Sequence, residues 1–423
     1  MAKLSRPQAP GLQSRSGTLW NWCAEATQSR SSGGGTGSDS YNMTAAMALV
    51  GCVGASAWLK QALATDCEEK LDVNVMTYNV LSPALARPSH YKLTEPELLD
   101  VDKRYGHIRS RLDVATSVGT IIGLQEVDLR WAGQLHAFFA ERGYCAVFAQ
   151  YGSDFSNYMG VMVAWPTAKY ETEEVEIVRL SDTAPKDTWP KSAGRPPLGG
   201  TFTNYEVKDI TGSFPPSNDN QFDEWQTARW RKNEAIYVRL KSRASSGPAR
   251  SFVVGNYHMP CLFGTAAKVR VVNIHSYLLM RRLRDFAKGD PCILLGDFNL
   301  KPSDPAYRFI AEGGDLTADK WVSSPEEVRG LKERLPAETP FPTGLTSAYK
   351  TFHGCEPLFT NYAQTGKESP FCETLDYIWF TPADFDVVRC PPMPASRRDV
   401  RGPFPSVSEP SDHIPLSATL RMH

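Results

Sequence analysis

The stretch CILLGDFN, residues 292–299, places a run of apolar residues directly before an aspartate and an asparagine. Short apolar runs of this length are typical of strands buried in a sheet. Similar runs are VNVMTY at 73–78, TIIGLQ at 120–125, FVVGNY at 252–257 and LDYIWF at 375–380. Two other stretches, 105–118 and 268–287, carry apolar residues at helical spacing. The pattern predicts one α/β domain over residues 70–423.

The composition limits the kind of protein this can be. The chain has 423 residues, 41% of them hydrophobic, which is enough to bury a substantial core. Its net charge of -1 excludes a globally basic nucleic-acid binder, although an enzyme with a local basic patch remains open. The nine cysteines include no CxxC pair, so we expect neither a structural zinc site nor a disulfide framework.

Residues 1–65 differ from the rest of the chain, being rich in Ser, Gly, Thr and Ala. The first 24 residues carry Lys3, Arg6 and Arg15 but no acidic residue, as organelle-targeting leaders do. A disordered tail would also have this composition. Both a cytoplasmic and a mitochondrial location therefore stay open. The apolar stretch 43–59 is too short for a membrane anchor, so we expect no stable membrane insertion.

Long connections interrupt the predicted domain. Residues 181–222, 335–345 and 390–411 are rich in Pro, Gly and polar residues and predict loops. The sequence Ser324-Pro325-Glu326-Glu327 has the pattern of a capping box and predicts the start of a short helix. Loops of this length in a compact domain are often binding elements.

Carboxylate, amide and imidazole side chains recur at the ends of the predicted strands. They are Asn79, Glu126, His258, Asp297, Asn299, Asp376, Asp412 and His413. Strand ends at one edge of a sheet are where α/β enzymes place their sites, although each residue alone also suits a turn or a cap. Carboxylate and amide oxygens favour Mg²⁺ or Mn²⁺ over zinc. Since strand neighbours point to opposite faces, His413 needs a carboxylate other than Asp412 to orient it, and Asp376 is the best candidate.

Five of these segments together resemble the endonuclease/exonuclease/phosphatase superfamily. They are TYNVL (77–81), LQEVD (124–128), GDFN (296–299), LDYIWF (375–380) and SDHIPL (411–416), in family order across roughly 340 residues. The resemblance implies a four-layer α/β sandwich, with two packed mixed sheets flanked by helices. EPLFTNY (356–362) and PSVSEPSDHIPL (405–416) further resemble the carbon-catabolite-repression-type deadenylase branch, which includes nocturnin, the Angel proteins and the mitochondrial 2′-phosphodiesterase.

The resemblance also implies roles for the polar residues. Glu126 would be the principal ligand of Mg²⁺, or of Mn²⁺, with Asn79 and Asp412 beside the metal. Asp297 would activate the attacking water or hold a second ion. Asn299 and His258 would contact the scissile phosphate. His413, oriented by Asp376, would contact that phosphate or hold metal. One or two ions would neutralise phosphate charge and lower the pKa of a bound water.

Candidate substrate contacts are less specific. Trp230 and Arg231 interleave with other aromatic and basic residues in a way that suits single-stranded RNA, but buried tryptophans with a basic rim would look the same. Phe359, Asn361 and Tyr362 lie where the branch has its base-facing loop, and packing in the interior is the alternative. The segments 157–163 and 256–261 and the insertion 181–232 depart from the branch and leave the substrate open.

We therefore expect a Mg²⁺-dependent phosphodiesterase that removes nucleotides from the 3′ end of RNA and releases nucleoside 5′-monophosphates. A nocturnin-like phosphatase acting on a nucleotide or dinucleotide is the second hypothesis. A catalytically inactive RNA-binding module is the third, and the intact set of polar strand-end residues argues against it. The substrate would be single-stranded RNA or a nucleotide, and the sequence indicates no protein partner.

Overall fold

Two mixed six-stranded sheets form the core of the part of the chain that the structure describes. This structure is a computed structural model and describes residues 70–152, 156–185, 187–190, 223–243, 249–313 and 340–423. The first sheet has the order β13 (Phe385–Arg389), β14 (Leu416–Met422), β1 (Leu71–Asn79), β2 (Ile121–Val127), β4 (Gly160–Pro166) and β3 (Tyr144–Gln150). The second has the order β5 (Tyr170–Arg179), β6 (Glu234–Ser242), β7 (Ser251–His258), β8 (Cys292–Asp297), β12 (Asp376–Phe380) and β9 (Thr346–Ser347).

Strand direction brings several strand ends to one edge of each sheet. In the first sheet β1 runs parallel to β2, so both end at the same edge. In the second sheet β7 runs parallel to β8, while β12 runs antiparallel to β8. The last residues of β7 and β8 therefore lie beside the first residue of β12. A small hairpin, β10 (Asn361–Ala363) and β11 (Phe371–Glu373), stands apart from both sheets.

The two sheets pack face to face because their strands are apolar on both sides. Along β8, Ile293 and Leu295 belong to a buried cluster that includes residues of both sheets. Cys292 and Leu294 alternate with them and belong to a different cluster on the outer face. Strands buried on both faces have continuous apolar runs rather than alternating ones, which explains why CILLG has no polar residue.

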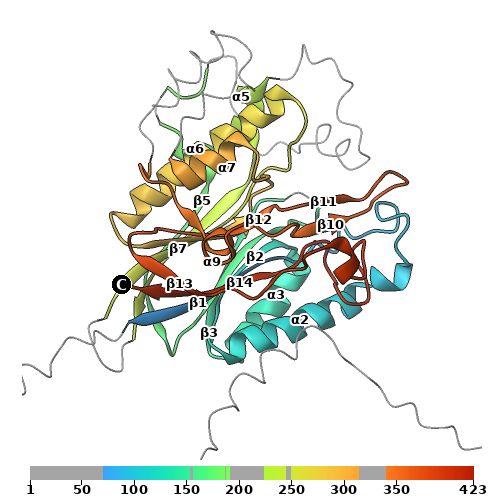
Figure 1. Cartoon of the computed structure of the whole chain (residues 1–423), viewed down its shortest axis with the longest axis horizontal. Helices are drawn as coiled ribbons and strands as arrows, with labels where there is room; N and C mark the ends of the chain where they lie inside the picture. The colour runs from blue at the N-terminus through green and yellow to red at the C-terminus, as the bar shows by residue number, and fades with distance from the viewer. Residues whose placement is uncertain (1–69, 153–155, 186, 191–222, 244–248, 314–339) are drawn as a thin grey trace, which may run out of the picture. The chain divides into compact units, whose positions relative to one another are not determined.

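Helices cover the two outer faces (Figure 1). The outer cluster of the first sheet includes residues of α2 (Val101–Ser117) and α3 (Leu129–Ala140). The outer cluster of the second sheet includes residues of α5 (Glu224–Trp230), α6 (Ala266–Ala287) and α7 (Pro305–Glu312). The predicted four-layer sandwich, two packed mixed sheets flanked by helices, is confirmed.

The strands and helices predicted from the sequence are present with small shifts of their ends. Strands predicted at 73–78, 120–125, 252–257, 292–296 and 375–380 correspond to β1, β2, β7, β8 and β12. Helices predicted at 105–118 and 268–287 correspond to α2 and α6. The loop 390–411 contains one short 3-10 turn, η8 (Arg397–Asp399), and is otherwise irregular.

Other elements were not predicted, among them α3, α5, α7, α9 (Ala348–His353), β3, β4, β5, β6 and β13. The signal for α3 was present, since Trp131, Leu135 and Phe138 recur at helical spacing after Asp128, which caps the helix. The leader 1–65, the helix start at Ser324 and residues 191–222 of the predicted loop lie outside the described residues. No helix within the described residues is long and apolar enough to span a bilayer.

Candidate active site

Three of the predicted site residues share one row of the second sheet. The register of β7 and β8 pairs His258 with Asp297, and that of β8 and β12 pairs Asp297 with Asp376. Paired residues on neighbouring strands point to the same face. Asp297 continues the alternation of Ile293 and Leu295, so all three side chains face the first sheet. Each is buried.

Asn79 connects this row to the first sheet. Its Nδ2 donates to Asp297 Oδ2 at 3.0 Å and to Glu126 Oε1 at 3.1 Å. Its Oδ1 accepts from the backbone N–H of Leu81 at 2.9 Å. Because both amide atoms are engaged, Asn79 is held in one orientation and brings a carboxylate of each sheet to the same place.

Glu126 reaches the site through an irregularity in β2. Strict alternation after Gln125, which lies between the sheets, would turn Glu126 to the outer face. The pairing of β2 with β4 instead shifts register between Leu124 and Val127, and Glu126 adopts a φ of 59°. A bulge of this kind re-aims a side chain, and a left-handed non-glycine residue is a strained conformation typical of functional sites. Glu126 Oε2 then accepts from the backbone N–H of Ser82 at 3.0 Å.

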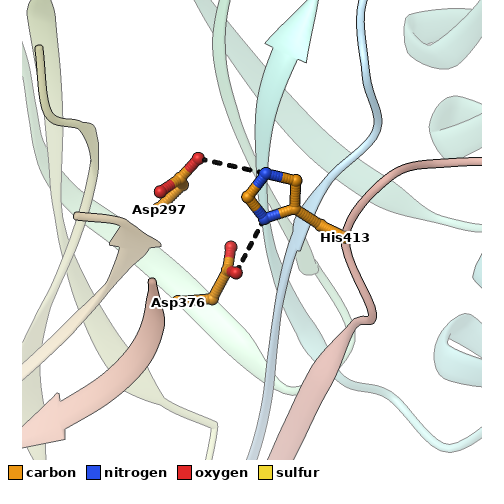
Figure 2. A group of neighbouring side chains, drawn as sticks. All are labelled: Asp297, Asp376 and His413. Carbon is orange, nitrogen blue, oxygen red and sulfur yellow. Dashed lines mark hydrogen bonds and ion pairs between the residues drawn. The ribbon is translucent and has the colours of Figure 1, made fainter. Parts of the chain in front are cut away.

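His413 lies between two carboxylates (Figure 2). Its Nδ1 is 2.8 Å from Asp376 Oδ2, and its Nε2 is 3.6 Å from Asp297 Oδ2. Thr360 Oγ1 donates to the same Asp376 oxygen at 2.6 Å. Burial disfavours the charged imidazole, but Asp376, Asp297 and Asp412 outweigh it and raise the pKa of His413 well above its usual range. The predicted pairing of His413 with Asp376 is therefore present in the structure.

Asp412 precedes His413 on the same loop, and its side chain is held by different partners. Its Oδ2 accepts from Tyr91 Oη at 2.9 Å and from Asn361 Nδ2 at 3.3 Å. Ser411 holds the same loop against β1, because its Oγ donates to the backbone oxygen of Asn79 at 2.6 Å. These contacts fix the loop against the first sheet and the β10–β11 hairpin.

The donor set fits a divalent cation. Possible ligand atoms of Asp297, Asp376 and His413 lie within 4.8 Å of one another, and as long as His413 is protonated the two carboxylates are the ones that can hold a cation. Within the described residues, Asp376 Oδ1 and Asp412 Oδ1 are buried and have no hydrogen-bond partner. A buried carboxylate oxygen without a donor is costly unless a cation or water satisfies it. Hard oxygen ligands of this kind suit Mg²⁺ and Mn²⁺.

Asn299 also lies at this edge, two residues after Asp297. Its backbone N–H donates to Asp297 Oδ1 at 3.0 Å, and its φ of 47° is left-handed. Its Nδ2 donates to the backbone oxygen of Met259 at 2.9 Å. The amide carries two protons, and with one acceptor among the described residues the other can donate to a ligand.

The predicted substrate residues are not all placed as expected. For Phe359 both a contact with a base and packing in the interior were open. It is 0% exposed and packs in a cluster with Tyr362 and Phe404. A ring enclosed in this way cannot stack on a base in this conformation, so packing is the alternative that the structure supports. Tyr362 is also buried, and Asn361 contacts Asp412.

Trp230 and Arg231 lie at the C-terminal end of α5 and are half-buried. The backbone oxygen of Arg231 accepts from Arg179 Nε at 2.8 Å and from Ser181 Oγ at 3.2 Å. These contacts tie the end of α5 to the last residue of β5 and to the segment that follows it. A contact of either side chain with RNA stays a prediction.

Several residues of the site were not anticipated. Tyr151 Oη lies 2.5 Å from His258 Nδ1, and Tyr91 and Thr360 hold Asp412 and Asp376. Burial lowers the pKa of His90, and the nearby charges of Asp412 and Glu126 oppose this. Only EPLFTNY, which contains Thr360, carried a signal in the sequence. A single tyrosine after a strand or in a loop carries none, because its partner is distant along the chain.

An aromatic and basic group was also missed. Phe371, at the start of β11, is 38% exposed, and its ring centroid lies 5.8 Å from that of Phe263. Lys301 Nζ lies 5.4 Å from the centroid of the Phe371 ring and 2.7 Å from Glu373 Oε1. Phe263 follows His258 by five residues and Lys301 follows Asn299 by two, so the group borders the site along the chain.

The sequence pattern of the Endonuclease/Exonuclease/phosphatase family matches residues 76–413. The chain belongs to this family. The match spans Asn79, Glu126, Asp297, Asp376 and His413, which the fold brings to one edge. The resemblance seen in the sequence is thereby confirmed, and the family takes its name from enzymes that hydrolyse phosphate esters.

Curated relatives of this family member include deadenylase-branch proteins. Nocturnin of Drosophila melanogaster is 31% identical over 184 residues, covering 43% of this chain and 27% of nocturnin. The CCR4-Not complex 3′-5′-exoribonuclease subunit Ccr4 of Aspergillus niger is 25% identical, covering 82% of this chain and 51% of Ccr4. The 2′,5′-phosphodiesterase 12 of Mus musculus is 33% identical over 141 residues, covering 33% of this chain and 21% of that protein. The matched regions thus span about half or less of each relative.

Solved structures show the same fold. The structure of ANGEL2, a 2′,3′-cyclic phosphatase, in complex with adenosine-2′,3′-vanadate has a TM-score of 0.57 and 17% identity, covering 84% of this chain and 96% of that chain. The human nocturnin catalytic domain with bound sulfate has a TM-score of 0.52 and 18% identity, covering 84% of this chain and 98% of that chain. At this identity the likeness concerns the fold alone.

Proposed function

We propose that this chain is a Mg²⁺-dependent phosphodiesterase that removes nucleotides from the 3′ end of RNA and releases nucleoside 5′-monophosphates. Mn²⁺ could replace Mg²⁺, and one or two ions would suit the donor set. The proposal rests on family membership, on the site at the joined edges of the two sheets, and on the Ccr4 relative, an exoribonuclease subunit that matches most of this chain.

One observation carries the proposal. Asn79 Nδ2 donates to both Glu126 and Asp297, so carboxylates from the two sheets converge on one point. His413, oriented by Asp376, lies at the same point, within 3.6 Å of Asp297 Oδ2. A site with acidic residues for a cation and imidazoles for a phosphate suits hydrolysis of a phosphodiester.

The chain's own residues would divide the work as follows. Glu126, Asp376 and Asp412 supply carboxylate oxygens for the cation, which when bound neutralises phosphate charge and activates water. Asp297 accepts the proton of the attacking water as its oxygen bonds to phosphorus, the bond from phosphorus to the 3′ oxygen breaks, and the leaving 3′ oxygen takes up a proton from water. His258, His413 and the free amide proton of Asn299 donate to the phosphate oxygens. No covalent nucleophile is needed, because positioning and charge stabilisation supply most of the catalysis.

The exposed aromatic group offers a place for the base. Phe371 and Phe263 present ring surface beside Lys301, and stacking of bases on aromatic residues with a nearby cation is a recurring mode of RNA binding. We propose this group, rather than Phe359, as the base contact. This group would accept different bases, because stacking depends on the flat face that every base has and not on its hydrogen-bonding groups.

A gel assay with 5′-labelled oligonucleotides tests the proposed function. Poly(A), mixed RNA, 2′,5′-linked oligoadenylate and DNA would be incubated with Mg²⁺ or with EDTA. We expect a Mg²⁺-dependent ladder on RNA, and a rate loss of about 10²-fold or more in Glu126→Gln, because a preorganised charge is removed from the site. Glu171→Gln, an exposed glutamate on the edge strand β5, is the matched control. Wild-type activity in Glu126→Gln would overturn the assignment.

A nocturnin-like phosphatase is the second candidate. It is favoured by the match to nocturnin, which at 31% identity exceeds the 25% of Ccr4, although over a shorter stretch. Release of inorganic phosphate from NADPH, without shortening of any oligonucleotide, would select this function. Binding of RNA without any Mg²⁺-dependent hydrolysis would instead indicate an inactive RNA-binding module.

A further inference from the structure

Tyr151 contacts a site residue from outside the set that binds cation or phosphate. It follows β3 of the first sheet, and its side chain is 7% exposed. Its Oη lies 2.5 Å from Nδ1 of His258, the last residue of β7 in the second sheet. The two rings meet edge to face, with centroids 6.0 Å apart and planes at 75°. The contact therefore bridges the two sheets at the site.

The direction of this hydrogen bond follows from the phenol. Burial, helped by the nearby Glu126, Asp297 and Tyr257, raises the pKa of Tyr151 well above its usual range, so the phenol keeps its proton. A buried hydroxyl proton needs an acceptor. Within the described part of the chain, the acceptor that the structure gives it is His258 Nδ1. In a neutral imidazole, one nitrogen that accepts leaves the other as the donor.

The surroundings of the other ring nitrogen, Nε2, agree with a hydrogen bond from Tyr151 to Nδ1. His258 Nε2 lies 3.4 Å from Asp297 Oδ2, so a proton on Nε2 points at a carboxylate. The opposite tautomer would place the Nε2 lone pair against that carboxylate, which is unfavourable. It would also leave His258 unable to donate from Nε2 to a phosphate oxygen.

We propose that Tyr151 is a positioning residue that fixes His258 as the Nε2–H tautomer, so that Nε2 is a donor, directed toward Asp297 in this structure and able to donate to the scissile phosphate when substrate is bound. The catalytic consequence rests on the proposed phosphodiesterase function, whereas the tautomer itself does not. In this proposal Tyr151 acts through His258 and has no contact of its own with substrate or cation.

The central test is Tyr151→Phe, which removes one oxygen atom and keeps the ring. We expect kcat to fall about 10-fold with KM changed less than about twofold, because the hydrogen bond matters most where phosphate charge develops. In a His258→Gln background, which has no imidazole to orient, Tyr151→Phe should change kcat less than about twofold. Tyr144→Phe is the matched control, since Tyr144 also lies buried on β3 but donates to the backbone oxygen of Thr116.

A spectroscopic measurement separates this proposal from the proposed function. The ¹⁵N chemical shifts of His258 in the full chain should show an unprotonated Nδ1 and a protonated Nε2 in the wild type, and a mixture in Tyr151→Phe. A protonated Nδ1 in the wild type would overturn the proposal. Wild-type kcat in Tyr151→Phe, or an equal loss in the His258→Gln background, would do the same. A chain that hydrolyses no phosphodiester but shows the predicted shifts would refute the function and keep the tautomer.

Discussion

At the scale of single residues, the Asp376–His413 pair shows how buried charge is arranged at the site. Asp376 Oδ2 receives two hydrogen bonds, from Thr360 and His413, while its Oδ1 has no partner among the described residues. Burial raises the pKa of Asp376 and the charge of His413 opposes this. One oxygen therefore orients the imidazole, and the other is free to face a cation or water.

Asp376→Asn tests this arrangement. The amide has the shape of the carboxylate but no charge to hold an imidazolium or a cation. We expect kcat to fall by about 10²-fold or more with the fold intact, in the range found for general acid–base groups. Single-turnover kinetics and circular dichroism measure the two effects. Asp72→Asn, which removes a charge from the exposed pair with Arg421, should leave kcat unchanged. Loss of folding in Asp376→Asn would show a structural rather than a catalytic role.

At the scale of elements, strand alternation explains most of the site and a bulge explains the rest. Asn79, His258, Asp297 and Asp376 all continue rows that face the space between the sheets. Glu126 does so only because β2 shifts register after Leu124. Periodicity in the sequence predicts the rows, whereas the bulge depends on how β2 pairs with β4, which follows it by more than 30 residues.

His275 links three elements on the outer face of the second sheet and makes stability sensitive to acid. Tyr257 of β7 donates to its Nδ1 at 2.9 Å, and its Nε2 donates to the backbone oxygen of Ala228 in α5 at 2.9 Å. Burial lowers the pKa of His275 to about 4. The unfolded chain, with a pKa near 6.5, then takes up a proton first as the pH falls.

His275 therefore contributes fully to the free energy of unfolding above about pH 6.5. This contribution, about 3 kcal/mol in total, is lost as the pH falls toward 4. We expect the free energy of unfolding to drop by about 2 kcal/mol more in the wild type than in His275→Gln between pH 7 and pH 5. Urea unfolding at the two pH values measures this difference. Parallel pH dependence in both proteins would show that His275 does not titrate on unfolding.

At the scale of the whole molecule, a net charge of -1 provides no general attraction for a polyanion. Any attraction for RNA must then be local. Arg397, Arg398 and Arg401 are exposed on the loop 390–411. Val400 and Phe404 of this loop pack with Tyr362 of β10, and Asn361 beside it contacts Asp412 of the site. The loop therefore places three positive charges close to the hairpin that borders the site.

If the substrate is RNA, neutralising these arginines should weaken binding without changing the chemistry. We expect Arg397→Gln/Arg398→Gln/Arg401→Gln to raise KM for a 20-nucleotide RNA at low salt and to reduce the salt slope of log KM by about 2. Hydrolysis of a dinucleotide should be unaffected. Lys241, Arg243 and Lys288, at the opposite end of the second sheet, supply a matched triple control. Equal losses for both triples would exclude a local RNA path.

Sequence alone determined the buried strands β1, β2, β7, β8 and β12, a polar residue at one end of each, and the family. These features depend on apolar runs and short motifs, which neighbouring residues specify. Only the tertiary structure decided that Phe359 is enclosed, that Glu126 turns inward and that Tyr151 meets His258. Tyr151 and His258 lie 107 positions apart, on different sheets. Contacts of this kind follow from strand register and from the packing of one sheet on the other, which no local pattern specifies.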